Sequence, residues 1–430
     1  MGIQRFNLTV RWLVLAVILL AAGGLIYVAV RYAVAEHWAA SSNPDLWLRA
    51  ANLEPANAGN WYRLGRYRQL DFENENLPLA ISYYQRATAI EPITALYWLD
   101  LAGTYETRGS LAMAEQSYRA AQQAYPISGE VAWRFGNFLL RQDRVPEAFQ
   151  QIQRAVTSDP KLATLAVSRC WRSTQDVDQI LNSALPANAD AYWGAIQFFV
   201  SAYEPNAAMT VWKRLAAKEH SFPLSQASPL LDLLIATNRG EDAQTVWEQA
   251  LSAAGIARPE GGASLIWNGD FEQELLNAGM AWRYQPIQGA ELDWDEEIVH
   301  SGRRSLRITF DGSANLDFQQ IWQYVSVKPN TAYRFSVYFQ TQQLTTDSGI
   351  HFEIHDVAPS NGIPPSTPNV VGTSPWALDE IQFTTGPRTH LIRVLLRRLR
   401  SNMLSNRVRG TVWVDDVSLV PASLPPLGAR

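Results

Sequence analysis

Three prolines at a constant spacing constrain this chain more than any other feature. Pro92, Pro126 and Pro160 stand 34 residues apart, and the segments before them carry small and aromatic residues at matching positions. A fixed period of this length is typical of helical hairpins that stack into an array, because one hairpin cannot bury its apolar face alone. Each proline ends a hairpin, since proline cannot continue the second helix. The sequence therefore predicts an α-helical solenoid in the middle of the chain.

Each unit places small residues where the two helices of a hairpin approach each other and aromatic residues where one hairpin meets the next. This pattern resembles the tetratricopeptide repeat (TPR) position by position over residues 59–160. The resemblance implies a scaffold whose groove holds a protein partner. The expected packing positions are Trp61, Leu64, Gly65, Ala80, Tyr84, Ala87, Pro92, Trp98, Leu101, Ala102, Tyr105, Ala114, Tyr118, Ala121, Pro126, Gly136, Ala148, Ile152, Ala155 and Pro160.

The repeat pattern weakens on both sides of these units. Residues 45–55 have the spacing of the second helix of an incomplete repeat, and residues 161–189 suggest a shortened, irregular helix pair. Farther on, Ala208 and Trp212 are echoed 35 positions later by Ala243 and Trp247. End units of repeat arrays are commonly atypical because they cap the array. We therefore expect a solenoid over residues 36–256, with clear repeats at 59–160 and degenerate ones at 161–256.

An uncharged apolar run near the N-terminus bears on the compartment. Residues 12–30 carry no charge, and at helical rise they reach roughly 28 Å, close to the hydrocarbon thickness of a bilayer. Arg5 and Arg11 precede the run, which favours a cytoplasmic N-terminus. The alternative is a cleaved signal peptide, since Ala33-Val34-Ala35 suits a cleavage site. We expect a cytoplasmic stub and a transmembrane helix within residues 1–35, in a bacterial-type inner membrane, with the bulk of the chain exported.

The period changes after residues 257–263, a stretch with proline and glycine that we interpret as a linker. Apolar and polar side chains then alternate in segments 306–310, 333–339 and 350–354. Such alternation places one face of each strand against a core. Strands of this kind, separated by turn residues, indicate an antiparallel β-sandwich over residues 264–421, followed by a tail at 422–430.

Four segments of this region resemble carbohydrate-binding modules of the galactose-binding-like jelly-roll type, in that family's order. They are residues 268–272, 300–306, 327–336 and 412–419. The resemblance implies a jelly roll that binds glycan and often holds a structural calcium. Glu272 and Asp416 match the carboxylates that would bind the ion; otherwise the second acid only shapes a turn or accepts backbone N–H groups. Because one fold hosts many functions, the fold is better specified than glycan binding.

Strand parity suggests where a glycan would bind. With the apolar residues of each strand facing the core, the intervening residues form the opposite row. Sugar recognition requires flat aromatic faces and planar polar groups. We expect one polar-aromatic surface on a single sheet, made by Trp322, Tyr324, Arg334, Tyr338, His351, Glu353 and His355. The alternatives are an ordinary solvent face, or a surface docked onto the repeats.

Two further charged patterns leave alternatives open. His351, Glu353 and His355 cannot all bind one metal ion, because the ends of this segment stand roughly 13 Å apart on a strand; one adjacent pair could, with ligands from elsewhere. Seven arginines between positions 388 and 409 suit an acidic polysaccharide or a lipid headgroup. The acids at 291–297 would instead neutralise them within the domain.

Composition and missing motifs exclude several classes of protein. A net charge of −5 gives no general footprint for nucleic acid. Cys170 is the sole cysteine, so the chain has neither an intrachain disulfide nor a thiolate cluster, and we expect this thiol to be buried. No nucleophile elbow, phosphate loop, zincin motif or dinucleotide fingerprint occurs. We predict a protein that is not an enzyme and has no cofactor apart from a possible structural calcium.

Together these features predict a membrane-anchored scaffold of the cell envelope. Its repeats would bind a protein, and its jelly roll would bind a polysaccharide during surface polysaccharide assembly or secretion. The alternatives are a purely structural interaction protein whose sandwich no longer binds sugar, and a cryptic glycan-active enzyme.

Overall fold

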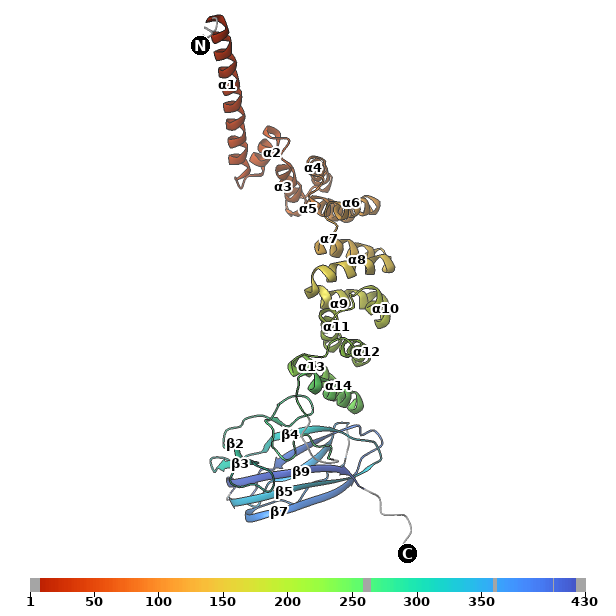
Figure 1. Ribbon diagram of the computed structural model, residues 1–430, viewed down its shortest axis with the longest axis vertical. Helices are drawn as coiled ribbons and strands as arrows, with labels where there is room; N and C mark the ends of the chain where they lie inside the picture. Colours follow the sequence, from red (N-terminus) through yellow and green to blue (C-terminus); the bar gives the residue numbers. More distant parts are fainter. Residues whose placement is uncertain (1–7, 258–263, 359–361, 405, 423–430) are drawn as a thin grey trace, which may run out of the picture. The chain divides into compact units, whose positions relative to one another are not determined.

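The computed structural model describes residues 8–257, 264–358, 362–404 and 406–422. The chain divides into two compact units, residues 1–187 and 188–430. In the described residues, fourteen α-helices precede nine β-strands (Figure 1). This order confirms the expected fold class, a helical array followed by an antiparallel β-sandwich.

The first helix, α1 (Leu8–Ala39), is long and apolar enough to cross a membrane, a test that a signal sequence also passes. Residues 12–30 are all exposed. Its last turns are different, because Ala35 and Ala39 are buried and Nε of Arg31 lies 2.7 Å from Oε1 of Glu54. The expected division at residues 35 and 36 therefore falls inside a continuous helix that packs against the next one.

Seven helices follow, and six of them form the three predicted hairpins (Figure 1). They are α2 (Pro44–Leu53), α3 (Ala58–Leu70), α4 (Leu77–Ile90), α5 (Ala95–Thr107), α6 (Leu111–Ala124), α7 (Gly129–Arg141) and α8 (Val145–Ser158). The unit then ends with the short 3₁₀ helix η1 (Pro160–Leu162), α9 (Ala163–Thr174) and α10 (Val177–Ser183). The last two are the shortened pair that the sequence suggested.

Polar caps and prolines set the limits of these helices. Oδ1 of Asn57 accepts the backbone N–H of Asn60, and Oδ1 of Asn76 accepts that of Leu79 at 3.0 Å. Such caps satisfy N–H groups that have no partner within the helix. Pro92 and Pro126 lie exposed in the turns after α4 and α6. The period of 34 residues thus marks hairpin ends, as expected.

Close contact inside the hairpins explains their small residues. A Cβ placed on Gly65 would lie 2.7 Å from the ring of Tyr84, and one on Gly136 would lie 2.9 Å from Ile152. The expected packing residues are buried, except the three prolines and Trp98. Trp98 is half-buried, and its indole N–H donates to the carbonyl oxygen of Pro92 at 2.8 Å.

The second unit begins with two further hairpins, α11 (Ala189–Ser201) with α12 (Pro205–Ala216), and α13 (Leu224–Ala236) with α14 (Gly240–Ala253). Trp212 and Trp247, at equivalent positions of the weak repeat, are both buried. Of the predicted linker at 257–263, only Ala257 lies within the described residues.

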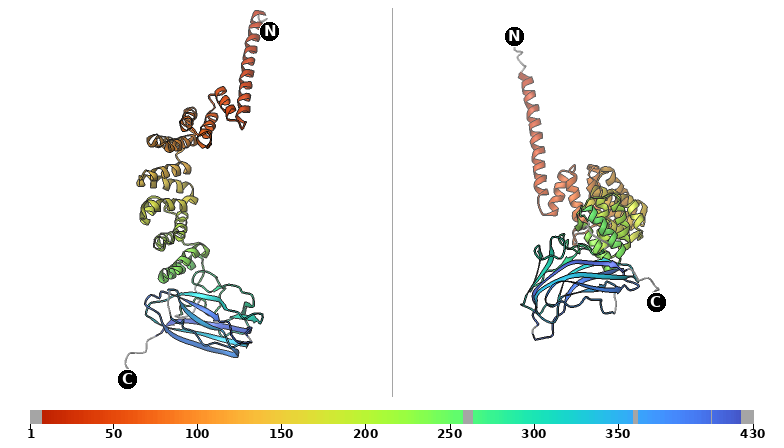
Figure 2. Two further views of the ribbon diagram at one scale, coloured as in Figure 1. Left: turned by 180° about the vertical axis from the view of Figure 1, so that it is seen from behind. Right: turned by 60° about the horizontal axis from the view of Figure 1, so that its bottom comes forward.

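The sandwich consists of two sheets, and every described strand pair is antiparallel (Figure 2). One sheet has the order β1-β4-β8-β6 and the other β2-β3-β9-β5-β7. The strands are β1 (Arg283–Tyr284), β2 (Ala290–Asp295), β3 (Ser305–Asp311), β4 (Phe318–Ser326), β5 (Ala332–Leu344), β6 (His351–Asp356), β7 (Gly372–Thr384), β8 (Leu391–Arg398) and β9 (Arg409–Pro421). The apolar residues of all three alternating segments fill the core between the sheets, as predicted.

Candidate functional site

The four-stranded sheet brings five of the seven predicted glycan-binding side chains onto one face. Its register aligns Tyr324 on β4 with Arg393 on β8, and Arg393 with His355 on β6. The next outward row aligns Trp322 with Glu353 across Leu395. Because alternate residues of these strands fill the core, these side chains belong to the outer face. His351, the fifth, stands on β6 opposite Arg397.

Glu353 lies at the centre of a small polar network on this face. Its Oε1 lies 3.2 Å from Nε2 of His351, and its Oε2 lies 2.7 Å from Nε2 of His355. Burial raises the pKa of this carboxyl, but hydrogen bonds from His355 and His351 outweigh that effect and hold the pKa below its ordinary value. The acid is therefore an ionised hydrogen-bond acceptor at neutral pH.

One nitrogen of this network has no partner in the described part of the chain. His351 is only 6% exposed, and its buried Nδ1 forms no hydrogen bond with a described residue. A buried polar atom without a partner is costly, unless a ligand or water satisfies it. In the described part of the chain, no group of three or more His, Cys, Asp or Glu is arranged to hold a metal ion.

The two arginines of β8 on this face differ in their contacts. Arg397 donates to the carboxylate of Asp317 and to the carbonyl oxygen of Phe318, so it is committed within the domain. Arg393 is half-buried and forms no hydrogen bond or ion pair through its side chain with a described residue. A guanidinium has five N–H donors in a planar fork. Arg393 therefore offers free donors to a ligand, between an aromatic ring and an imidazole.

Part of this face is covered by the helical pair α13–α14. Tyr324 lines a cavity together with residues of α14, and the guanidinium of Arg283 lies 5.5 Å from its ring centroid. Arg283 in turn pairs with Asp232 of α13 at 2.7 Å. The β1–β4 side of the sheet thus adjoins α13–α14, while Trp322 and Tyr324 on β4 remain half-buried.

Two predicted residues lie elsewhere, so the expectation of one surface on a single sheet is wrong for them. Arg334 and Tyr338 are on β5, which belongs to the five-stranded sheet. Tyr338 stacks on His300 with ring centroids 3.5 Å apart, and His300 meets Trp376 edge-on. Parity placed both predicted residues correctly outward, but strand order decides the sheet, and parity does not encode strand order.

The two carboxylates matched to calcium both contact the loop at residues 300–304. Oε1 of Glu272 accepts the backbone N–H groups of Arg303 and Arg304, and Oδ1 of Asp416 accepts the hydroxyl of Ser301 at 2.8 Å. Protein donors therefore satisfy these oxygens. The calcium expectation stays a prediction, with oxygen ligands of the hard type that calcium prefers.

The first unit presents a different polar surface. Asp100 on α5 accepts the phenol hydroxyl of Tyr62 at 2.7 Å and a guanidinium N–H of Arg134 at 3.0 Å. Burial, followed by the hydrogen bond to Asp100, raises the pKa of Tyr62. These contacts join helices of three successive hairpins, which gives the array a continuous polar row.

Sequence reasoning missed several residues that the fold brings to these surfaces. Trp267 and Met280 line the cavity at α14, and His300 and Trp376 extend the aromatic group on the other sheet. Trp247 is marked in the sequence only as a repeat-packing position, and His300 only as part of the segment 300–306. No local pattern marks Trp267, Met280 and Trp376. They are found only when loops and strands are placed in three dimensions.

No family model matches the sequence, and no curated protein matches it at a significant level. Among solved structures, a CBM4 structure shows 19% identity and a TM-score of 0.27, over 36% of this chain and 99% of its own. YrrB, a TPR protein with an unusual peptide-binding site, shows 12% identity and a TM-score of 0.27, over 50% of this chain and 94% of its own. The enzymatically active domain of tailspike protein 4 from bacteriophage CBA120 shows 8% identity and a TM-score of 0.28, over 37% of this chain and 22% of its own. Because these scores are low, fold and function rest on the geometry of the chain itself.

Proposed function

We propose that this protein is a non-catalytic, membrane-anchored scaffold of the cell envelope, in which the repeats bind a protein and the sandwich binds glycan. Surface polysaccharide assembly or secretion is the setting that suits this combination. The observation that carries the proposal is the outward row Tyr324–Arg393–His355, with Trp322 and Glu353 beside it. It offers aromatic surface, free donors and an ionised acceptor on one face, which are the groups that sugar recognition requires.

The non-catalytic part of the proposal is supported by the state of Glu353. Both of its oxygens lie within hydrogen-bond distance of imidazole nitrogens, and its pKa is lowered rather than raised. A glycosidase acid needs a raised pKa so that it can protonate the leaving group. A reducing-end assay with polysaccharides of several classes tests this; release of new reducing ends would favour the enzyme alternative.

Retention of the anchor is supported by the packing of α1. Cleavage after Ala35 would remove Arg31, which pairs with Glu54, and Ala35 itself, which is 2% exposed. A signal peptide is removed, so its residues cannot be part of the interior of the mature fold. The mass of the protein isolated from membranes tests this, since loss of about 35 residues would show a cleaved signal peptide.

Glycan binding is tested with the full-length chain in detergent on a glycan array. Arg393→Ala is expected to lower affinity for any bound glycan by about tenfold, because it removes hydrogen bonds from a charged donor. Arg334→Ala is the matched control, since it removes an arginine from the other sheet.

If Arg334→Ala weakens binding and Arg393→Ala does not, the site lies on the five-stranded sheet. If the wild-type chain binds no glycan with calcium present, the purely structural alternative is favoured.

A further inference from the structure

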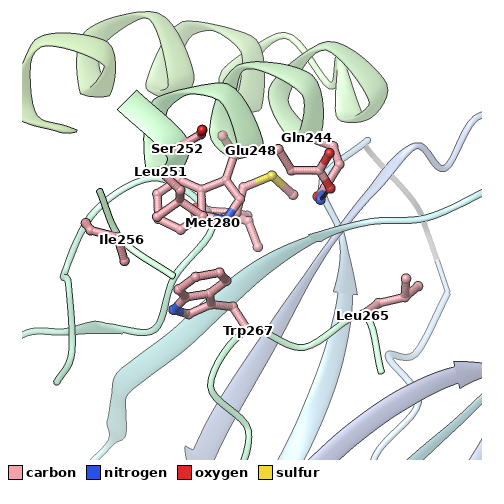
Figure 3. Close-up of a pocket in the computed structure, with 10 residues that line it drawn as sticks. Gln244, Glu248, Leu251, Ser252, Ile256, Leu265, Trp267 and Met280 are labelled. Atoms are coloured by element: carbon pink, nitrogen blue, oxygen red, sulfur yellow. Dashed lines mark hydrogen bonds between the residues drawn. The ribbon is translucent and has the colours of Figure 1, made fainter. Parts of the chain in front are cut away.

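A cavity of about 350 Å³ lies between helix α14 and the sandwich within the second unit (Figure 3). Residues of α14 line the side that is uppermost in Figure 3, and Trp267 and Leu265 at the start of the sandwich lie below them. Tyr324 of β4 also lines the cavity. The residues that line the cavity include Gln244, Trp247, Ser252, Trp267, Met280 and Tyr324. The volume is at the small end of the range for ligand pockets, about 300–1,000 Å³.

The walls of the cavity are held by close backbone contacts. Gly240, the first residue of α14, approaches the carbonyl oxygen of His390 so closely that a Cβ would overlap it. Nδ2 of Asn238 donates to the carbonyl oxygen of Arg388 at 3.0 Å. Gly279 has φ +53°, and a Cβ there would lie 2.6 Å from the ring of Trp247. These contacts fix α14 on the sandwich, so the cavity exists before a ligand arrives and ordering it costs little.

Three aromatic side chains, those of Trp247, Trp267 and Tyr324, are among the residues that line the cavity. The indoles of Trp247 and Trp267 stand almost perpendicular, at 82°, with centroids 5.6 Å apart. Met280 is buried beside them, and the half-buried Tyr324 adds a third ring. Flat apolar surfaces at different angles suit a rigid ring more than a flexible chain, because a ring keeps its shape while contacting several walls.

The polar groups of the cavity lie along α14. Nε2 of Gln244 donates to Oε1 of Glu248 at 2.6 Å, which leaves the amide oxygen of Gln244 able to accept. Ser252 is exposed two turns beyond Gln244. On the opposite wall, the indole N–H of Trp267 is buried and has no acceptor among the described residues. The site therefore combines apolar walls with accessible polar groups along α14.

We propose that this cavity binds one or two pyranose rings of a glycan, which makes α14 part of the sugar site; the inference rests on the proposed glycan-binding function. A pyranose has apolar C–H faces that fit aromatic walls and a rim of hydroxyls that donate and accept. An acyl chain or an aliphatic side chain would bury the amide oxygen of Gln244 without a partner, at a cost. The repeat array and the sandwich then share one ligand.

The test is isothermal titration calorimetry of the full-length chain in nanodiscs with defined oligosaccharides of glucose, N-acetylglucosamine and uronic acids. Ser252→Trp fills the cavity from an exposed position and is expected to weaken binding by about tenfold or more. Thr245→Trp is the matched control, because Thr245 is exposed on the same helix and does not line the cavity. Gln244→Ala is expected to weaken binding by about threefold to tenfold.

The outcomes separate the two proposals. Sugar binding that is lost in Arg393→Ala but unchanged in Ser252→Trp and Gln244→Ala overturns the cavity site and keeps the sheet face. No binding of any oligosaccharide by the wild-type chain overturns the glycan function and this site with it. Binding of a decanoyl detergent that Ser252→Trp abolishes, without any sugar binding, assigns the cavity to an apolar ligand and also overturns the inference.

Discussion

The hairpin α5–α6 of the first unit and the hairpin α13–α14 of the second have an aromatic residue at the same repeat position, but it contacts different neighbours. Tyr118 on α6 stacks on Phe135 of the following hairpin, with centroids 5.6 Å apart. Trp247 on α14 instead meets Trp267, which belongs to the sandwich. The sandwich thus occupies the place of a next repeat. An array needs a cap for its last apolar face, and here the cap is a whole β domain.

Removal of Trp247 should have the largest effect on the contact between the last hairpin and the sandwich. Trp247→Ala is expected to cost about 3–5 kcal/mol, because it leaves a cavity at a buried position. Hydrogen exchange should then rise in α13, α14 and the adjoining strand β4. Tyr118→Ala should raise exchange in the first unit alone. Unchanged protection of β4 in Trp247→Ala would show that the sandwich does not depend on this contact.

The glycine that faces Trp247 gives the second largest expected effect. Gly279→Ala should cost about 1–3 kcal/mol, because its Cβ overlaps the indole ring and φ is positive. Gly255→Ala is the matched control: φ is also positive, at +69°, but no atom of a described residue lies within 4 Å of the added carbon. The difference in urea midpoint between the two variants isolates the contact from the backbone strain. Equal midpoints would mean that the junction has room for a methyl group.

The Glu353 network lies on the side of the four-stranded sheet away from α13–α14, and its contribution to stability should depend on pH. Glu353→Gln should cost about 1–2 kcal/mol at neutral pH, because it removes a charged hydrogen-bond acceptor. The pKa of Glu353 is lower in the folded protein than its ordinary 4.5, so its contribution is complete above that value and is lost as the pH falls through the folded-state pKa.

The measurement for Glu353→Gln is thermal unfolding from pH 7 to pH 3, where the difference from wild type should shrink. Glu380→Gln, at a more exposed carboxylate on the other sheet, should show a smaller difference at every pH. A gap that stays constant down to pH 3 would contradict the lowered pKa.

Labelling of Cys170 in α9 is a probe of the first unit alone, and the expected effect is the smallest of the set. Burial raises the pKa of this thiol to about 12, so at pH 8 it should react with iodoacetamide only when the first unit opens. Labelling measured by mass spectrometry should be slow in wild type, equally slow in Trp247→Ala, and faster in Tyr118→Ala. Faster labelling in Trp247→Ala would show that the two units open together.

Much of the helical fold could be predicted from sequence, because the residue type at each repeat position indicates which helix it packs against. The small residue at Gly65 already implies a close partner helix, and the structure supplies Tyr84. Strand faces were equally readable, since the apolar residues of segments 306–310, 333–339 and 350–354 all enter one core. Local periodicity is sufficient for both inferences.

The candidate site could be predicted only in part, because it depends on which strands are neighbours. His351, Glu353 and His355 share one strand, so their common face follows from parity. Tyr338 has the same outward parity but lies on the other sheet. The cavity at Trp267 requires helix α14 and a loop of the sandwich to meet within the second unit, and no spacing in the sequence encodes that contact.

The continuity of α1 has a mechanical consequence for the whole first unit. Because the helix runs unbroken from its apolar part to Ala39, and its end packs against α2, α2 is coupled directly to the apolar part and not through a flexible linker. One residue inserted between the apolar part and Ala35 would turn α2 by about 100° around the helix axis and shift it by about 1.5 Å along that axis. Under the proposed anchoring, the length of this one helix would set the direction in which the first unit faces along the membrane.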